Sequence, residues 1–317
     1  MKLNYIKQTL RISNSSLFSG SIKQFNKSTL FNKLSFKRFS ISIKNKFNNG
    51  VVKLPHFSKI EKGGEDAYIA HEGIICVSDG VGGWAEHGVD PAKYSLELCH
   101  NINKLFIEKG NTLFHQPKQL FSESVTKTLN QGSATCCFCV LDLEKEYIHT
   151  LNLGDSGYII LRKQQNDIKN KDTSNSASIG IEVVFRSEEQ THSFNFPFQV
   201  GTGGDDPNSA MTNVHKFKEN DIIILGTDGL WDNLFDEQII RIVKPFLEGG
   251  NVIRDINLLA EMIGITAEKY SLNQHWKSPF CVRSNGQYMG GKPDDITIIV
   301  TQIVKNEKWN EEKIITL

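Results

Sequence analysis

Aspartates stand at the ends of three separate apolar segments of this sequence. The segments are ICVSDG (75–80), IILGTDG (223–229) and PDDITIIV (293–300), which place Asp79, Asp228 and Asp294 beside predicted strands. Strand ends are rigid, so three of them meeting at one sheet edge would gather these carboxylates from distant parts of the chain. Such a cluster repels itself unless cations lie within it. The pattern therefore predicts a centre for Mg²⁺ or Mn²⁺, which prefer oxygen ligands.

Two further features strengthen this prediction. Gly80 follows Asp79, and a glycine there lets the backbone approach an ion and offer its carbonyl as a ligand. Glu65 and Asp66 add two carboxylates near the start of the first predicted strand. A single Asp-Gly pair is most often only a turn, so the prediction depends on the whole set rather than on any one member.

The elements that must position these residues follow from apolar periodicity. Pro91 begins a helix in which Tyr94, Leu98, Ile102 and Leu105 repeat at three- and four-residue spacing. Two more helices are predicted between residues 237 and 270, and the polar segment 163–178 is predicted to be a solvated loop. Strands are predicted at 66–70, 73–78, 134–141, 147–153, 158–161, 181–185, 221–227 and 296–304. This order of elements indicates a mixed α/β protein with antiparallel sheets.

Other catalytic motifs are poorly matched. The segment GDSG (154–157) is interpreted as a turn between strands, because the sequence around it lacks the remainder of a serine-protease pattern. No cysteine begins a C-x₅-R loop, and no phosphate-binding P-loop motif occurs. Cys136 and Cys139 lie three apart in a predicted strand and so face opposite ways, which favours buried, reduced thiols.

The amino-terminal sixty residues differ in composition from the rest of the chain. They contain twelve Lys and Arg residues, many serines and no Asp or Glu, whereas the whole chain has 36 basic and 36 acidic residues. A basic, Ser-rich, acid-free segment without an apolar core is typical of an organelle transit peptide, and a disordered basic arm is the alternative. The charge balance gives no reason to expect nucleic-acid binding, and no segment is long enough to span a bilayer.

Six motifs in order resemble one known family. They are GGEDAY (63–68), VSDGVGGW (77–84), GSAT (132–135), LNLGDSG (151–157), GTDGLWD (226–232) and KPDDIT (292–297). Together they resemble the metal-dependent serine/threonine protein phosphatases of type 2C, the PPM family. The segments DGVGGW (79–84), EQTHSFNFPFQ (189–199) and GGKPDDIT (290–297) are most similar to its mitochondrial branch.

The resemblance implies a fold, a reaction and a set of roles. The fold is an α+β, four-layer α-β-β-α sandwich of two antiparallel sheets flanked by helices. The reaction is hydrolysis of phosphoserine and phosphothreonine in proteins by a metal-activated water, with Asp79, Asp228 and Asp294 as catalytic residues. Asp79 would bridge two Mn²⁺ or Mg²⁺ ions, with the Gly80 carbonyl on one and Asp228 and Asp294 on the other. Glu65 and Asp66 would reach metal-bound waters.

Two positions depart from the family pattern. Val81 stands where many members have a histidine, which leaves protonation of the leaving oxygen unassigned, with His87 nearby in sequence. Lys62 is the nearest cation to the place where many members hold the substrate phosphate with an arginine. These departures leave two alternatives open: a pseudophosphatase that binds phosphoproteins, and a small-molecule phosphatase on the same scaffold.

The expected domain organisation follows from both arguments. Residues 1–50 are expected to form a mitochondrial transit peptide or disordered basic tail, residues 51–306 a PPM-type phosphatase domain, and residues 307–317 a carboxyl-terminal tail. The expected location is the mitochondrial matrix, and the expected partners are phosphorylated proteins and the mitochondrial import machinery.

Overall fold

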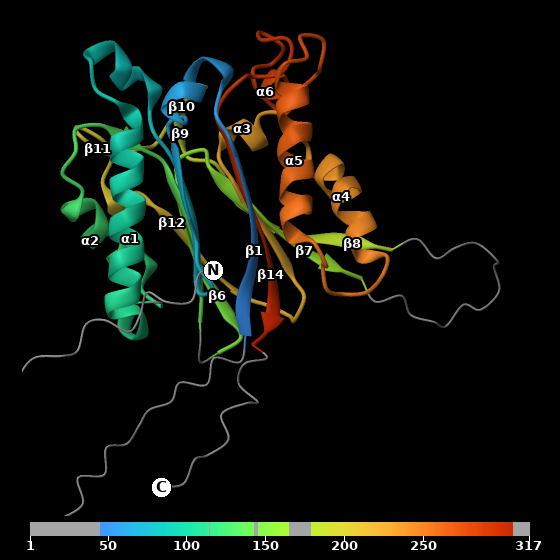
Figure 1. Ribbon diagram of the computed structural model, residues 1–317. Helices are drawn as coiled ribbons and strands as arrows, with labels where there is room; N and C mark the ends of the chain where they lie inside the picture. Colours follow the sequence, from blue (N-terminus) through green and yellow to red (C-terminus); the bar gives the residue numbers. More distant parts are fainter. Residues whose placement is uncertain (1–44, 114, 143–144, 165–178, 307–317) are drawn as a thin grey trace, which may run out of the picture. The chain divides into compact units, whose positions relative to one another are not determined.

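The computed structural model describes residues 45–113, 115–142, 145–164 and 179–306. Within these residues, two five-stranded sheets stack face to face and helices cover their outer faces (Figure 1). Helices α1 and α2 cover one sheet, whereas α4 and α5 cover the other. This is the predicted four-layer arrangement, and the prediction of antiparallel sheets is confirmed because every paired strand is antiparallel.

The first sheet has the order β1-β14-β13-β7-β8. Its strands are β1 (Asn45–Leu54), β7 (Gly157–Lys163), β8 (Ile181–Arg186), β13 (Ile222–Gly226) and β14 (Ile296–Lys305). The second sheet has the order β12-β6-β5-β3-β2. Its strands are β2 (Asp66–Ala70), β3 (Ile74–Asp79), β5 (Cys136–Leu141), β6 (Tyr147–Leu153) and β12 (Met211–Lys216). Short strand pairs are formed by β4 (Ser133–Ala134) with β11 (Val200–Gly201) and by β9 (Thr191–Ser193) with β10 (Phe196–Pro197).

The helices include the three predicted from periodicity. The α-helices are α1 (Pro91–Leu113), α2 (Pro117–Lys127), α3 (Asp228–Trp231), α4 (Asp236–Val243), α5 (Ile256–Ser271) and α6 (Pro279–Arg283). Short 3₁₀ helices are η1 (Phe57–Lys62), η2 (Gly82–His87), η3 (Pro207–Ser209) and η4 (Lys244–Leu247). None of the described helices is both long enough and apolar enough to cross a membrane.

Apolar side chains form three buried layers between these elements. The central layer joins the inner faces of the two sheets and includes Val77, Tyr158 and Ile299. The outer layers join each sheet to its helices. Alternation along β5 sends Cys136 and Cys139 into different layers, as their spacing predicts, and all six cysteines are buried and free.

Strand β1 changes the expected boundary of the folded region. It begins at Asn45 and pairs with β14 over its whole length, so the boundary expected at residue 51 falls inside a strand. Phe47 is only 1% exposed and packs in the central apolar layer. The remainder of the expected tail, residues 1–44, lies outside the described residues, as do 165–178 of the predicted loop and the carboxyl-terminal segment 307–317.

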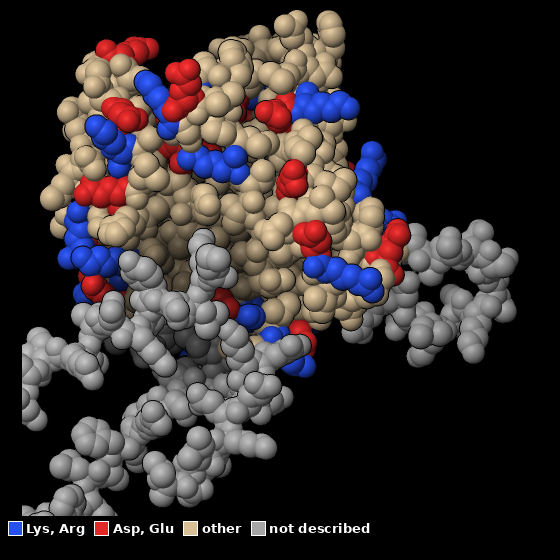
Figure 2. Space-filling model, viewed as in Figure 1, with Lys and Arg blue, Asp and Glu red and all other residues tan. Residues whose placement is uncertain are grey.

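Charged side chains of both signs are interspersed on one face of the molecule (Figure 2). Figure 2 shows Lys and Arg beside Asp and Glu on the viewed face, without a broad patch of either sign. Acidic side chains gather instead below the surface, at one edge of the two sheets.

Candidate active site at one edge of the two sheets

Strand register brings the predicted carboxylates to one edge. Asp66, at the start of β2, lies opposite Asp79, at the end of β3. In the other sheet Gly226, at the end of β13, lies opposite Gly157 of β7 and Ile298 of β14. Because antiparallel neighbours alternate ends, the start of one strand lies beside the end of the next. Segments far apart in sequence therefore place their aspartates together.

Asp79 interacts with every other predicted aspartate of this group. Its carboxyl is close enough to those of Asp66, Asp228 and Asp294 to be affected by their charges. Burial, followed by repulsion from these neighbours, holds the pKa of Asp79 well above its usual range.

Gly80 is required by close packing. A Cβ atom at Gly80 would lie 2.6 Å from the carbonyl oxygen of Pro91 and 2.9 Å from that of Glu65. The following residue, Val81, donates its backbone N–H to the Ser133 carbonyl at 3.0 Å, which fixes the turn after Asp79. A glycine is therefore needed here for packing against the backbone of Pro91 and Glu65, and the role of the Gly80 carbonyl as a metal ligand stays a prediction.

Asp66 is completely buried beside Asp79. Its Oδ2 accepts a hydrogen bond from the Thr227 hydroxyl at 2.9 Å, whereas no described hydrogen-bond partner lies near its Oδ1. Burial, together with the charge of Asp295, raises the pKa of Asp66 to about 8. An orphaned carboxylate oxygen in this position is suited to a cation or to a water that a cation orients.

Lys292 is the cation that the sequence analysis missed. Its ammonium contacts Asp228, lies 2.8 Å from Asp232 Oδ2 and lies 3.4 Å from Asp294 Oδ2. Burial opposes its charge, but these carboxylates hold the pKa of Lys292 well above its usual range. Burial is the largest single influence on Asp228 and by itself would raise its pKa, but the charge and hydrogen bond of Lys292, together with hydrogen bonds from Asp79 and the Gly229 backbone, lower it overall.

Asp294 and Asp232 keep intermediate proton affinities. Burial and the charge of Asp228 raise the pKa of Asp294 to about 6, with Lys292 opposing the increase. The pKa of Asp232 is raised to about 6, by burial first. Asp232 also contacts Arg283. Asp232 follows Asp228 by one helical turn of α3, so both carboxyl groups face the same side.

Glu65 belongs to a neighbouring ion-pair network. Lys59 Nζ lies 2.6 Å from Glu65 Oε2, 3.3 Å from Asp295 Oδ2 and 3.8 Å from Asp294 Oδ1. Asp295 also accepts the backbone N–H groups of His56 and Glu65, both at 2.7 Å, so it braces the loop before β2. The cation among these carboxylates is thus Lys59. Lys62 is exposed and has no ion pair with any residue of the described segments.

The GDSG segment is a turn, as predicted, but it also contributes to the site. Gly154 has φ +105°, and the turn joins β6 to β7. Asp155 within it is directed at the cluster: burial, then the charge of Asp228, holds its pKa well above the usual range. The sequence could have indicated this role, because Asp155 follows a predicted strand, as Asp79 and Asp228 do.

The cluster fits divalent cations by its chemistry. Asp66, Asp79, Asp155, Asp232 and Asp294 all have raised pKa values, because their negative charges oppose one another away from solvent; a divalent cation among them would stabilise the ionised carboxylates. In addition, Asp228 Oδ1 is buried and has no hydrogen-bond partner among the described atoms. An oxygen-only donor set of this kind suits Mg²⁺ and Mn²⁺.

A cavity of about 850 Å³ opens beside the turn that follows Asp79. Much of its wall comes from η2 and from the segment 192–205, which are connected by hydrogen bonds through Ser133 of β4. Trp84 Nε1 donates to Ser133 Oγ at 2.6 Å, and Ser133 Oγ donates to Gln199 Oε1 at 2.6 Å. The cavity is lined by Val81, Gly83, Trp84, Glu86, His87, Gln131, His192, Phe196, Gln199, Thr202, Gly203, Gly204 and Asp205.

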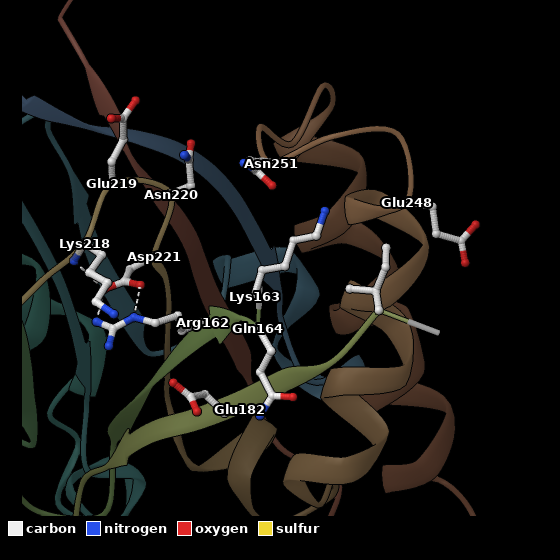
Figure 3. Close-up of a pocket in the computed structure, with 11 residues that line it drawn as sticks. Arg162, Lys163, Gln164, Glu182, Lys218, Glu219, Asn220, Asp221, Glu248 and Asn251 are labelled. Carbon is white, nitrogen blue, oxygen red and sulfur yellow. Dashed lines mark hydrogen bonds and ion pairs between the residues drawn. The ribbon is translucent and has the colours of Figure 1, made fainter. Parts of the chain in front are cut away.

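A second cavity, of about 1030 Å³, lies toward the opposite edge (Figure 3). Arg162 is directed at Asp221, with both donor–acceptor distances below 2.8 Å, and Lys163 donates to the carbonyl oxygens of Leu247 and Gly250. Arg162 and Lys163 are therefore engaged by the protein itself. Asp221 and Asp228 stand at opposite ends of β13, roughly 20 Å apart along the strand, so this cavity is separate from the carboxylate cluster.

Comparison with known sequences gives consistent relatives. The family model described as stage II sporulation protein E (SpoIIE) matches residues 71–244. The chain is 34% identical to "Probable protein phosphatase 2C 55" of Arabidopsis thaliana over 83% of its own length, and spans 53% of that relative. It is 33% identical to "Protein phosphatase PTC7 homolog" of Homo sapiens, covering 73% of this chain and 75% of the relative.

Solved structures share the fold. The X-ray structure of the photosystem II phosphatase PBCP matches 81% of this chain and 98% of its own, with a TM-score of 0.69 and 29% identity. The catalytic domain of the serine/threonine protein phosphatase PstP, in complex with two manganese ions, matches with a TM-score of 0.55 and 14% identity, covering 82% of this chain and 99% of that one. The second match shows similarity of fold alone.

Proposed function

Since the chain belongs to the type 2C (PPM) family of protein phosphatases, we propose that it hydrolyses phosphoserine and phosphothreonine esters of proteins with two Mn²⁺ or Mg²⁺ ions. The observation that carries this proposal is the buried carboxylate cluster at the sheet edge, with its orphaned oxygens and raised pKa values. A cluster of this kind costs folding free energy in the absence of cations, so its presence favours a role in chemistry.

We assign the metal ligands to residues on both sheets. Asp79 and the Gly80 carbonyl would hold one ion, with Asp79 shared by a second ion that Asp228 and Asp294 complete. Glu65 and Asp66 would hold waters in place around the ions. When bound, the ions would supply an activated water as nucleophile and would offset negative charge on the phosphoryl oxygens.

The remaining residues of the site hold these groups in place. Lys292 keeps Asp228 ionised, as a ligand must be, and orients Asp232 and Asp294. Lys59 and Asp295 fix the loop that carries Glu65. Asp155 adds a further carboxyl next to Asp228. Asp155 and Asp232 are therefore candidates for outer or additional metal contacts.

The cavity beside Val81 is the proposed binding place for the phosphorylated segment. Val81 has no proton to give to a leaving serine or threonine oxygen. Two histidines, His87 and His192, line the cavity, and the His192 ring lies 3.0 Å from Asp205 and stacks on Phe198. Aromatic and amide groups in this wall suit an extended peptide better than a small polar phosphate ester.

We place the protein in mitochondria, most specifically in the matrix. Support comes from the basic, acid-free composition of the first sixty residues and from the likeness of segments 79–84 and 189–199 to the mitochondrial branch. Fluorescence imaging of the full chain with a carboxyl-terminal tag tests this assignment. The import machinery would then be its second class of partner.

A phosphatase assay with the full chain tests the proposed activity. A phosphothreonine peptide and a small phosphate ester should be compared, each with Mn²⁺, with Mg²⁺ and with excess chelator. We expect peptide hydrolysis that requires the metal and exceeds hydrolysis of the small ester. Binding of the peptide without turnover would favour a pseudophosphatase, and a preference for the small ester would favour a small-molecule phosphatase.

A further inference from the structure

Two histidines and an aspartate form a compact group far from the carboxylate cluster. His115 Nδ1 lies 3.8 Å from Asp142 Oδ2, and His149 Nε2 lies 3.5 Å from the same oxygen. One potential ligand atom from each residue lies within 4.8 Å of the other two. The group joins the connection between α1 and α2 to the β5–β6 hairpin.

Local backbone structure fixes the positions of Asp142 and His149. Asp142 directly follows β5; its backbone N–H donates to the Tyr147 carbonyl at 2.9 Å, and its Oδ1 accepts the Lys145 N–H at 3.0 Å. These bonds fix the carboxylate and leave Oδ2 directed at His149. Alternation along β6 puts His149 on the same face as Leu151, which is the face covered by α1 and α2.

His149 has the features of a ligand rather than of a satisfied core histidine. The residue is 9% exposed, and its buried Nε2 has no hydrogen-bond partner among the described residues. A buried polar nitrogen without a partner is costly, so it calls for an explanation.

Two of the three ligand-to-ligand distances are close to those of a metal site, and the third, between the two histidines, is at most 4.8 Å. In a tetrahedral Zn²⁺ site with ligands at about 2.0–2.1 Å, ligand atoms are roughly 3.3–3.4 Å apart. The measured 3.5 Å and 3.8 Å exceed this by only a few tenths of an ångström. The His115 side chain is 41% exposed, so its ring can adjust and water can reach the fourth position.

We propose that His115, Asp142 and His149 form a Zn²⁺ site, separate from the catalytic centre, that ties the α1–α2 connection to the β5–β6 hairpin. The donor set decides between metals, because two imidazoles and one carboxylate suit Zn²⁺, whereas the all-oxygen cluster suits Mg²⁺ and Mn²⁺. Thr135 marks the edge of the catalytic centre, because its backbone N–H donates to the Asp79 carbonyl. Asp142 follows Thr135 by seven residues of extended chain, a distance of roughly 24 Å. The two sites therefore bind metal independently.

Metal titration of the full chain tests this site. The double variant Asp79→Asn with Asp228→Asn removes the catalytic ligands, and excess Mg²⁺ suppresses residual binding there. Zn²⁺ is then titrated by calorimetry, and Co²⁺ is titrated as a spectroscopic probe through its visible absorption. We expect one Zn²⁺ per chain and a Co²⁺ spectrum of four-coordinate nitrogen and oxygen ligation.

Variants of the cluster decide the assignment. His115→Ala changes an exposed side chain and should weaken Zn²⁺ binding at least tenfold without unfolding the protein, while His149→Gln should abolish it. His100→Ala, at an exposed position on α1, is the matched control and should leave binding unchanged. If Zn²⁺ affinity and stoichiometry are the same in both cluster variants as in the control, or if no Zn²⁺ binds to the double variant, the proposal is overturned.

Discussion

Replacing Asp66 with asparagine should make the metal-free protein more stable while impairing its use of metal. Asp66 is fully buried, and burial together with Asp295 raises its pKa from 3.8 to about 8. In the unfolded chain the same group ionises near 3.8, so above that pH the unfolded state is favoured by about 1.4 kcal/mol per pH unit. An asparagine removes this penalty, and its amide oxygen can still accept the Thr227 hydroxyl hydrogen bond.

The size of the effect follows from these values. At pH 7.5 the penalty has an upper limit of about 5 kcal/mol. The neighbouring carboxylates share protons with Asp66, so we expect a net gain of roughly 2 kcal/mol, or about 4–8 °C in Tm. At pH 5.0 the upper limit falls to about 2 kcal/mol, because the pH is then close to the ordinary pKa. The gain should therefore shrink by about two- to threefold.

Thermal unfolding in chelator at both pH values measures this effect. Asp221→Asn is the matched control, because Asp221 is equally buried but accepts two hydrogen bonds from Arg162. We expect that control to lose about 1–3 kcal/mol at either pH. Mn²⁺ should stabilise Asp66→Asn less than wild type, with affinity about 10–100-fold weaker. A lower Tm for Asp66→Asn in chelator at pH 7.5, or the same gain at pH 5.0, would refute the reasoning.

Three further predictions follow from the same structure. Phe47→Ala should reduce the free energy of unfolding by about 3–5 kcal/mol in urea denaturation, because it empties a core position in β1; an effect below about 1 kcal/mol would contradict the packing of β1. The Tm of the metal-free wild type should fall from pH 5 to pH 8, because carboxyl groups with a raised pKa bind more protons in the folded state than in the unfolded state. Saturating Mn²⁺ should remove this dependence on pH. A Tm of the metal-free protein that rises over this range would contradict the prediction. Lys292→Gln should destabilise the metal-free protein by about 3–5 kcal/mol and enlarge the Mn²⁺-induced increase in Tm, whereas an unchanged Tm would show that Lys292 does not balance the cluster.

The carboxylates at strand ends were predictable because the local sequence indicates both the strand and the aspartate that follows it. An apolar run followed by Asp-Gly marks both the strand and its end, and antiparallel pairing then brings such ends together. Asp155 also follows a predicted strand, but Gly154 precedes it and Ser156 follows it, and it was interpreted only as part of a turn. Asp232 was detectable in principle, because it lies one helical turn beyond Asp228.

The cations and the first strand could not be predicted, for different physical reasons. Lys292 lies in a loop and Lys59 in the short helix η1, outside the strands, and a lysine in such a segment looks the same in sequence whether it is solvated or buried. Strand β1 contains two Lys and three Asn and has buried residues only at Phe47 and Gly50, so it lacks the alternation of a strand with one buried face. It forms because β14 offers its edge and α5 covers it: a Cβ at Gly50 would lie 2.2 Å from the Ile256 carbonyl oxygen.

The most direct test of whether the carboxylate cluster is a catalytic metal centre is the turnover of a phosphothreonine peptide. Turnover is measured as Mn²⁺ is titrated into the full wild-type chain and into the Asp228→Asn variant. We predict that wild type gains activity with Mn²⁺ and loses it in chelator. Asp228→Asn should remain folded and lose more than about 100-fold in turnover at every Mn²⁺ concentration. Full wild-type activity in excess chelator, or near-normal turnover by Asp228→Asn, would contradict the assignment.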